Sequence, residues 1–220
     1  MKVIAINGSP RKEFNTGTLL KKVLEGLHSQ GVDAEIINLY ELDFSPCISC
    51  FYCKRKDNEH GFCAIDDDLS SVLESLKTVD AVVFGSPIYL MNLSAKMNAF
   101  LERFVFSNMI YSFEIPTVFP KKLKSAFIYT MNITEERADE IGLKNALGFH
   151  QEFLERILRE KPELLFSYNT YQFTDYDKYE HSIFSKEDKL NSKLNNFPID
   201  CDKAFNLGVK IGKSLNNIKH

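Results

Sequence analysis

The sequence predicts an α/β protein, built on a doubly wound parallel sheet with helices on both of its faces. Two observations lead to this fold class. Short apolar runs rich in valine, isoleucine and phenylalanine alternate with longer segments whose apolar residues recur every three or four positions. Two of these runs are also followed by Gly-Ser-Pro, which is typical of the turn after a strand. Because parallel strands need right-handed crossover connections, we expect the intervening helices to cover both faces.

The first half of the chain contains three predicted strands, at residues 3–6, 34–39 and 80–84. A helix around residues 19–27 presents a leucine-rich stripe and is stopped by Gly31. The second strand is followed by a cysteine-rich loop at residues 44–68. The run Asp66-Asp67-Asp68 at its end is interpreted as the N-cap and acidic first turn of the next helix.

In the second half, helices are expected at residues 95–106 and 204–215, and strands at 125–130 and 164–173. The longest helix is predicted over residues 135–160. Its inward stripe is expected to consist of Leu143, Leu147, Phe153, Leu154, Ile157 and Leu158. Residues 174–200 are polar, carry tyrosines and show no clear period, so we expect an extended arm that lies on another surface. Residues 1–220 are interpreted as a single domain. This arm and the cysteine-rich loop are the two segments that do not follow its alternation of strands and helices.

Composition excludes several function classes. The chain has 220 residues, 44% of them hydrophobic, and a formal net charge of −3. This apolar fraction can fill a core, so a wholly disordered chain is excluded. No basic surplus supports binding to nucleic acid as the main function. No unbroken apolar run exceeds four residues, far short of a membrane span. The apolar start is too short for a signal peptide, so we expect a cytoplasmic protein.

The loop after the first strand, residues 7–18, has the composition of a phosphate site. Ser9, Asn15, Thr16 and Thr18 supply hydroxyl and amide groups, and Arg11 adds a fixed, forked positive charge. The helix that follows offers unpaired N–H groups at its N-terminus. The loop matches neither dinucleotide nor nucleoside triphosphate fingerprints. Taken alone, it is explained equally well as an ordinary strand-turn-helix junction with Asn15 or Thr16 as the N-cap.

A second loop follows the third strand and changes this balance. It places a proline turn next to apolar and aromatic residues, which folding alone explains poorly and which suits a flat ring system. The residues concerned are Gly85, Ser86, Pro87, Ile88, Tyr89, Leu90, Met91 and Asn92. The two loops together favour a ligand that combines a phosphate with an aromatic ring.

These residues resemble the NAD(P)H-dependent FMN reductase superfamily. The resemblance rests on Gly8-Ser9-Pro10-Arg11 with Asn15-Thr16, and on Gly85-Ser86-Pro87-Ile88-Tyr89. It covers roughly residues 1–130 and implies a flavodoxin-like fold, with three layers and a five-stranded parallel sheet. The cysteine block resembles the iron–sulfur flavoprotein branch of the same superfamily. Two stretches depart from the family pattern, namely Glu13-Phe14 and the segment at residues 98–103.

The resemblance implies an FMN site in two parts. The phosphate would be held by Ser9, Arg11, Asn15, Thr16 and Thr18. The isoalloxazine ring would contact Ser86, Pro87, Ile88, Tyr89, Met91 and Asn92, with Thr130 and its neighbours Met131 and Asn132 on the other side. No catalytic acid or base is expected, since the flavin mediates the chemistry.

Four of the five cysteines lie close together, at Cys47, Cys50, Cys53 and Cys63. The first three have Cys-x-x-Cys-x-x-Cys spacing, which suits three of the four ligands of a [4Fe–4S] cluster, with Cys63 as the fourth. Zinc and a loop without metal are the alternatives. Cys201 stands alone and is interpreted as a small buried residue.

By the resemblance, the expected function is an FMN-dependent oxidoreductase that accepts hydride from NADH or NADPH and reduces a quinone, flavin or other small acceptor. An electron-transfer protein with FMN and a [4Fe–4S] cluster, served by a redox protein, is the second hypothesis. A thiol or metal sensor is the third. An exposed flavin face and the apolar side chains of the arm favour a homodimer or homotetramer. The sequence names neither the acceptor nor the preferred nicotinamide.

Overall fold

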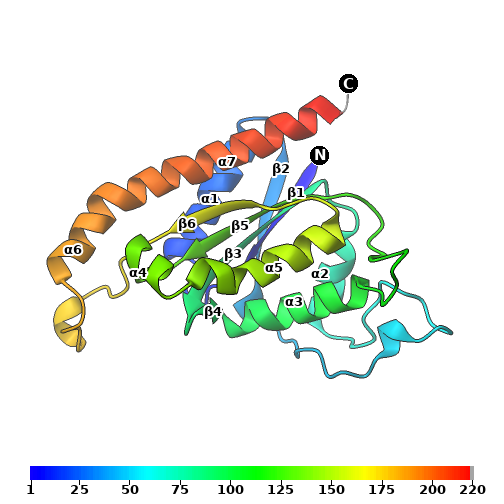
Figure 1. Ribbon diagram of the computed structural model, residues 1–220. Coiled ribbons are helices and arrows are strands. Elements are labelled where there is room, and N and C mark those ends of the chain that lie inside the picture. The colour runs from blue at the N-terminus through cyan, green and yellow to red at the C-terminus, as the bar shows by residue number, and fades with distance from the viewer. Residues whose placement is uncertain (219–220) are drawn as a thin grey trace.

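The computed structural model describes residues 1–218 and confirms the predicted fold class. Five strands run parallel in the order β2-β1-β3-β5-β6, the flavodoxin-like arrangement (Figure 1). They are β1 (Lys2–Asn7), β2 (Asp33–Asn38), β3 (Ala81–Tyr89), β5 (Lys124–Thr130) and β6 (Glu163–Ser167). The two-residue β4 (Asn92–Leu93) pairs antiparallel with the end of β3. Successive strands are added in one direction from β1 to β2 and in the opposite direction from β3 onward. Ligands bind in such sheets at this switch point, between β1 and β3.

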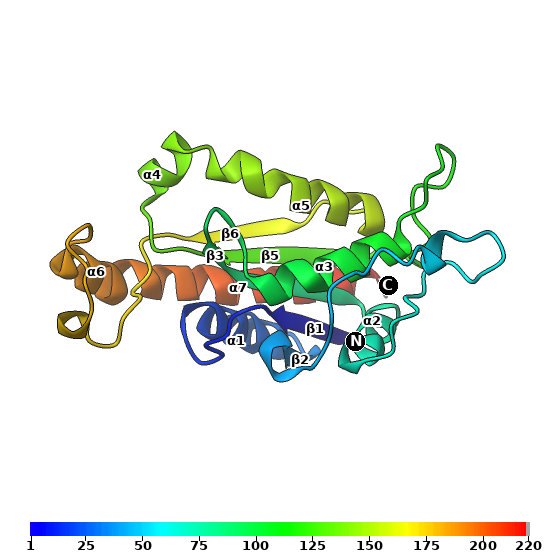
Figure 2. The ribbon, with the colours of Figure 1, turned by 90° about the horizontal axis from the view of Figure 1, so that it is seen from below.

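Helices cover both faces of the sheet, as Figures 1 and 2 show. One face carries α1 (Asn15–His28) and α7 (Phe197–Ile218), which pack against each other. The other carries α2 (Asp68–Leu76), α3 (Ala95–Asn108) and α5 (Leu143–Leu158). Alternate strand residues divide between the two cores, because successive side chains of a strand point to opposite faces. No helix within residues 1–218 has the length and apolar character to cross a bilayer.

The helix predicted over residues 135–160 is two helices. They are α4 (Glu135–Glu140) and α5, and they are separated at Gly142, whose φ is +68°. The left-handed conformation suits glycine and interrupts the helical hydrogen-bond ladder. Phe153, which the periodicity assigned to the inward stripe, is 44% exposed. It lies on the side of α5 toward α3, where a cavity replaces a tight helix contact.

Two predicted strand ends were wrong. β3 continues through Gly85-Ser86-Pro87 to Tyr89, where the sequence indicated a turn. The neighbouring β1 ends at Asn7, opposite Gly85, so Pro87 lies on a free stretch of that edge and its missing N–H is tolerated. β6 ends at Ser167, where its pairing with β5 ends, and not at residue 173.

The stretch predicted as an extended arm is largely helical and packs on its own chain. Helix α6 (Lys186–Asn191) continues through a π-helical stretch, Ser192–Asn196, into α7, which begins at Phe197 and not at residue 204. Tyr176 is buried against the rings of Tyr171 and Phe173. Short 3₁₀ turns occupy Leu39–Glu41, Tyr52–Lys54 and Tyr176–Lys178.

Candidate functional site: a cleft at the carboxyl edge and a cysteine cavity

A cleft opens at the carboxyl edge of the sheet, beside the point where the strand order reverses. The loops after β1, β5 and β6 form it, together with the start of α1 and the end of β3. Ten predicted FMN residues line it, namely Ser9, Arg11, Asn15, Thr16, Pro87, Ile88, Tyr89, Thr130, Met131 and Asn132. Phe14, Thr170 and Gln172 complete the lining. The structure therefore brings together both of the loops that the sequence singled out.

Local hydrogen bonds shape the loop after β1. The Asn7 side chain accepts the N–H of Ser9 at 3.0 Å and donates to Asn38 at 3.0 Å, so it fixes the turn to the neighbouring strand β2. The Ser9 hydroxyl accepts the N–H of Arg11 at 3.2 Å. A Cβ at Gly17 would lie 1.7 Å from the Lys12 carbonyl oxygen, so only glycine lets the loop fold onto the start of α1.

Helix α1 points its N-terminus into this loop. Its first residue is Asn15, and the N-cap position is held by Phe14, whose side chain has no acceptor for the helix N–H groups. The expectation of Asn15 or Thr16 as the N-cap was therefore wrong. The free N–H groups and the positive end of the helix dipole together favour an anion at this position.

The segment after β6 closes over the same loop, which the sequence did not indicate. Arg11 donates from Nη1 to the Gln172 carbonyl at 2.6 Å, and Asn15 donates to the Tyr171 carbonyl at 2.9 Å. The Arg11 guanidinium also stacks on the Phe14 ring, 3.9 Å from its centroid. No local pattern could reveal these contacts, because they join residues more than 150 positions apart.

Two buried contacts hold the far side of the cleft. Thr16 and Thr130 share a hydrogen bond of 2.7 Å between their hydroxyls, joining the loops after β1 and β5. Lys189, from α6, donates to the Asn132 carbonyl and to the Asn169 side chain. Burial lowers the pKa of Lys189 to about 8. In the sequence, Lys189 falls within the stretch predicted as an arm, and no local pattern indicates a role for it.

A two-residue turn connects β3 and β4 at the mouth of the cleft. Leu90 and Met91 form it, with φ of +49° and +64°, a conformation that favours Asn-Gly. Leu90 is fully exposed, and Tyr89 and Met91 are more than one-third exposed. Burial raises the pKa of Tyr89, so its hydroxyl stays protonated at neutral pH.

Four of the predicted FMN residues do not line the cleft. Ser86 is fully buried, where its hydroxyl donates to the Pro87 carbonyl and accepts the N–H of Ser94. Met91 belongs to the exposed turn, and the Asn92 side chain accepts the N–H of Leu93 beside it. Thr18 lies one turn into α1, with its N–H bonded to the Phe14 carbonyl. These residues shape the surrounding loops.

The lining of the cleft suits FMN. Hydroxyls, an amide, a guanidinium and a helix N-terminus converge at one end, as a phosphate ester requires. Apolar and aromatic residues with a few polar groups follow at the other end, which is typical of a ring site. The Asn132 side-chain oxygen is buried there with no hydrogen-bond partner among the described residues, so it is available to a ligand donor.

The four clustered cysteines surround one small cavity, between the 44–68 loop and the C-terminal half of α3. Cys53 is buried, Cys47 and Cys63 are partly exposed, and Cys50 is exposed. Within residues 1–218, no three potential ligands stand close enough to hold a single metal ion.

Two cations lie at the cysteine cavity. Lys54 contacts the Phe106 ring and donates to the carbonyls of Phe106 and Met109. Burial raises the pKa of the Cys53 thiol, and the neighbouring Lys54 opposes this rise. Burial also lowers the pKa of Lys54. Lys54 therefore offsets only part of the effect of burial, and the neutral thiol of Cys53 is favoured.

Arg103 is the second cation, and it fastens both ends of the cysteine-rich loop. It donates to the Ser45 carbonyl at 3.2 Å, to the Ile65 carbonyl at 3.0 Å, and to Asp67 at 2.5 Å. Its side chain is fully buried and lines the cysteine cavity. Asp67 is also the N-cap of α2, as predicted. The sequence placed Arg103 only in a stretch that departs from the family pattern.

Comparisons with known proteins give a family match and several relatives. Residues 1–119 match the family model described as NADPH-dependent FMN reductase. An iron–sulfur flavoprotein of Methanocaldococcus jannaschii is 39% identical over 103 residues, which are 47% of this chain and 51% of that protein. One from Methanosarcina thermophila is 30% identical over 105 residues, 48% of this chain and 53% of that protein. The matches thus span about half the length of these curated relatives.

A solved structure extends the likeness of the fold to the rest of the chain. The NAD(P)H:quinone oxidoreductase from Methanothermobacter marburgensis superposes with a TM-score of 0.69 at 16% sequence identity. The superposition covers 100% of this chain and 98% of that one. At this identity the likeness concerns the fold alone.

Proposed function

Since the chain belongs to the NADPH-dependent FMN reductase family, we propose that it is an FMN-dependent oxidoreductase that takes electrons from NAD(P)H and passes them to a small acceptor such as a quinone or a flavin. One observation carries this proposal. The uncapped N-terminus of α1 meets the side chains of Ser9, Arg11 and Thr16 in the same cleft as Pro87 and Tyr89. A phosphate site thus adjoins a ring site.

The residues of the β1 loop would hold the phosphate. Arg11 supplies a positive charge and can donate two parallel hydrogen bonds, and Ser9, Asn15 and Thr16 supply neutral donors. Arg11 and Asn15 donate at present to carbonyls of the segment after β6. A phosphate dianion accepts more strongly from these groups than a neutral carbonyl does. The hydrogen bond between Thr16 and Thr130 fixes the phosphate end of the cleft relative to the ring end.

The loops after β3 and β5 would hold the ring. FMN, when bound, accepts hydride and releases electrons singly or in pairs. Pro87 and Ile88 exclude water from one side of the cleft, and Lys189 keeps the Asn132 backbone in place. Tyr89 stands at the open mouth as a neutral hydroxyl donor. No side chain of the cleft is placed as a general acid or base in this proposal.

The test is FMN binding by the purified protein and two variants. We expect one FMN per chain, and weaker binding by about 1.5–3 kcal/mol in Arg11→Ala, which loses a charge-assisted bond. Ser9→Ala removes a neutral donor and should weaken binding by about 0.5–1.5 kcal/mol. Arg137→Ala is the matched control, since Arg137 pairs with Glu140 on exposed α4. Unchanged affinity in both cleft variants, or FAD in place of FMN, would disprove the assignment.

A second candidate function is electron transfer through FMN and a [4Fe–4S] cluster. The observation that favours it is the single cavity shared by Cys47, Cys50, Cys53 and Cys63, with Arg103 in its wall. The named relatives are described as iron–sulfur flavoproteins, which supports the same hypothesis. In this case a redox protein could replace NAD(P)H as the donor.

Iron and acid-labile sulfide per chain, measured in protein purified without air, test the second candidate. We expect about four of each per chain in the wild type if the cluster forms. Cys50→Ser should lose the iron and keep FMN, because the flavin cleft belongs to a different segment. Cys201→Ser is the control, since Cys201 packs on the other face of the sheet. Fewer than about one iron per chain after anaerobic reconstitution would leave the flavin reductase alone.

A further inference from the structure

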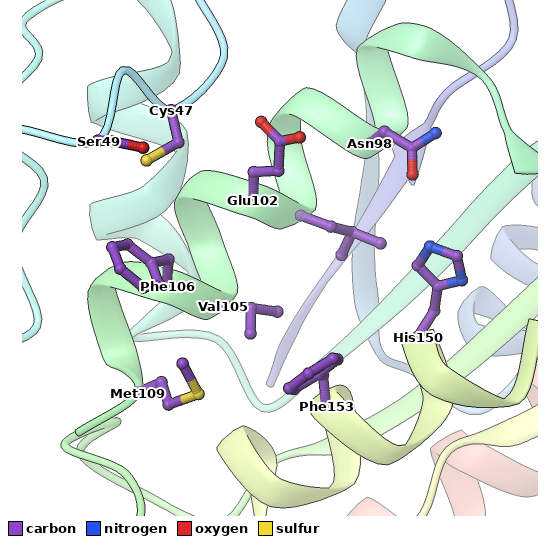
Figure 3. A pocket seen from close by; sticks show the side chains of 10 residues that line it. Cys47, Ser49, Asn98, Glu102, Val105, Phe106, Met109, His150 and Phe153 are labelled. Carbon is purple, nitrogen blue, oxygen red and sulfur yellow. The ribbon is translucent and has the colours of Figure 1, made fainter. Parts of the chain in front are cut away.

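A cavity of about 530 Å³ lies between α3 and α5, and it shares no residue with the flavin cleft. Its volume falls within the range of about 300–1,000 Å³ that small-molecule sites occupy. Figure 3 shows its floor and walls, which are mainly apolar. Val105, Phe106 and Met109 come from α3, and Phe153 from α5. Two aromatic rings and a thioether favour a flat aromatic ligand.

His150 is a polar side chain in this wall that a ligand could reach. Its Nδ1 atom is buried beside the Leu147 backbone, which leaves Nε2 for the ligand. Burial also lowers the pKa of His150, so the ring is neutral at physiological pH. Figure 3 places His150 and Asn98 at one end of the cavity and Cys47 with Ser49 at the opposite end. A neutral imidazole can donate to or accept from a hydroxyl or carbonyl.

Charge narrows the class of ligand further. Glu102 lines the cavity, and no basic side chain does. A phosphate or carboxylate would be repelled there, which argues against a nucleotide such as FMN or NAD(P)H. We propose that this cavity binds a neutral, flat aromatic molecule whose single polar substituent bonds to His150. The position beside Cys47 puts this ligand next to the cysteine cavity, away from the flavin cleft.

The test uses 2-naphthol as the probe and calorimetry with the FMN-bound protein, in the absence of NAD(P)H. We expect saturable binding of one molecule per chain. Val105→Phe fills the cavity and should weaken binding at least about tenfold, since the probe loses its space. Phe153→Ala removes a ring contact without adding atoms, and it should weaken binding about fivefold. Phe153→Ala also keeps the test decisive if Val105→Phe fails to fold.

His150→Phe separates the hydrogen bond from the apolar contacts. This variant should bind 2-naphthol about fivefold more weakly, the effect of one neutral hydrogen bond. It should bind 2-methylnaphthalene, which has no hydroxyl, as the wild type does. Phe149→Ala is the matched control, because Phe149 lies on the same helix, is exposed and does not line the cavity.

Four outcomes would overturn the proposal. The first is no saturable binding to the wild type, and the second is wild-type affinity in both Val105→Phe and Phe153→Ala. The third is loss of binding in Tyr89→Ala while Val105→Phe still binds, which would place the probe on the flavin. A change of sedimentation coefficient in Val105→Phe would identify the cavity as a contact between two copies of the chain, and it too would overturn the proposal.

Discussion

Arg103 is a fully buried charge, and its partners explain why the interior tolerates it. Asp67 neutralises the guanidinium, and two carbonyls from the ends of the cysteine-rich loop accept its remaining N–H groups. Its Nε atom alone has no partner among the described residues. Arg103 therefore ties both ends of the cysteine-rich loop to α3, in addition to the contact that Lys54 makes with the same helix.

We predict that Arg103→Met destabilises the protein by about 3–5 kcal/mol, because it leaves the largely buried Asp67 carboxylate without its charge partner. The measurement is urea unfolding at pH 7. Arg137→Met, which breaks an exposed pair on α4, should cost less than about 0.5 kcal/mol. A loss below about 1 kcal/mol in Arg103→Met would contradict the attachment role.

Lys189 makes the free energy of unfolding depend on pH. Its folded pKa is about 8, below the value of 10.5 of an exposed lysine, and no carboxylate pairs with it within residues 1–218. The unfolded chain therefore binds more protons than the folded chain between about pH 8 and 10.5. Stability from this group rises with pH across that window.

We predict that Lys189→Met removes this rise. The quantity to measure is the difference in unfolding free energy between wild type and Lys189→Met, at intervals from pH 7 to 10.5. The difference should shift in favour of the wild type as the pH increases above about 8. Lys193→Met, two residues beyond the end of α6, serves as a control, because Lys193 is exposed. A difference independent of pH would refute the lowered pKa.

At the scale of elements, the β3–β4 hairpin carries strain that the fold does not require. A two-residue turn with both φ values positive is most stable as Asn-Gly, whereas this chain has Leu90-Met91. Each left-handed non-glycine residue costs about 1–2 kcal/mol. Apolar side chains that are strained and exposed at the mouth of the flavin cleft indicate a contact made outside this chain.

Replacing Leu90-Met91 by Asn-Gly should therefore stabilise the isolated fold by about 1–2 kcal/mol. Urea unfolding of the double variant measures this gain. Leu190-Asn191→Asn-Gly, in exposed α6, is expected to destabilise instead, because glycine weakens a helix by about 1 kcal/mol. If the hairpin variant were less stable than the wild type, the strained turn would have to hold contacts within the chain.

At the scale of the whole molecule, the two candidate sites lie at opposite ends of α3. Ser94 caps the helix beside the flavin cleft, and Arg103 and Phe106 reach the cysteine cavity. A rise of 1.5 Å per residue separates them by roughly 15 Å along the helix. Figures 1 and 2 show the cysteine-rich loop and α6 at opposite ends of the molecule.

Self-association stays a prediction, and the structure adds the hairpin to its basis. Tyr176 of the former arm is buried in its own chain, whereas Tyr179 and Ile183 of the arm and Leu90 and Met91 of the hairpin are exposed. We predict a homodimer or homotetramer, since a second copy would cover these side chains and the open face of the cleft. Sedimentation at micromolar concentration tests it, and Leu90→Ser with Met91→Ser should dissociate the assembly. A wild-type monomer of about 25 kDa would refute the prediction.

Features with local causes could be predicted from the sequence alone. The five strands were predicted from short apolar runs, and the phosphate loop from polar residues that follow one another after β1. The family resemblance, confirmed by the match over residues 1–119, rests on the same contiguous motifs. The end of β6, the break at Gly142 and the start of α7 were predicted wrongly, because neighbours in the sheet and the packing of helices decide where such elements end.

Contacts between distant residues could not be predicted in this way and are seen only in the folded chain. Arg11 donates to Gln172, and Lys189 donates to Asn132. Arg103 links Ser45 to Asp67. The partners in each contact lie far apart in the sequence, so no periodic pattern of apolar residues predicts them. The cavity beside His150 likewise depends on how α5 lies against α3. The physical reason is that apolar periodicity reports which face of an element is buried, whereas the partner across that face is chosen by the packing of the whole chain.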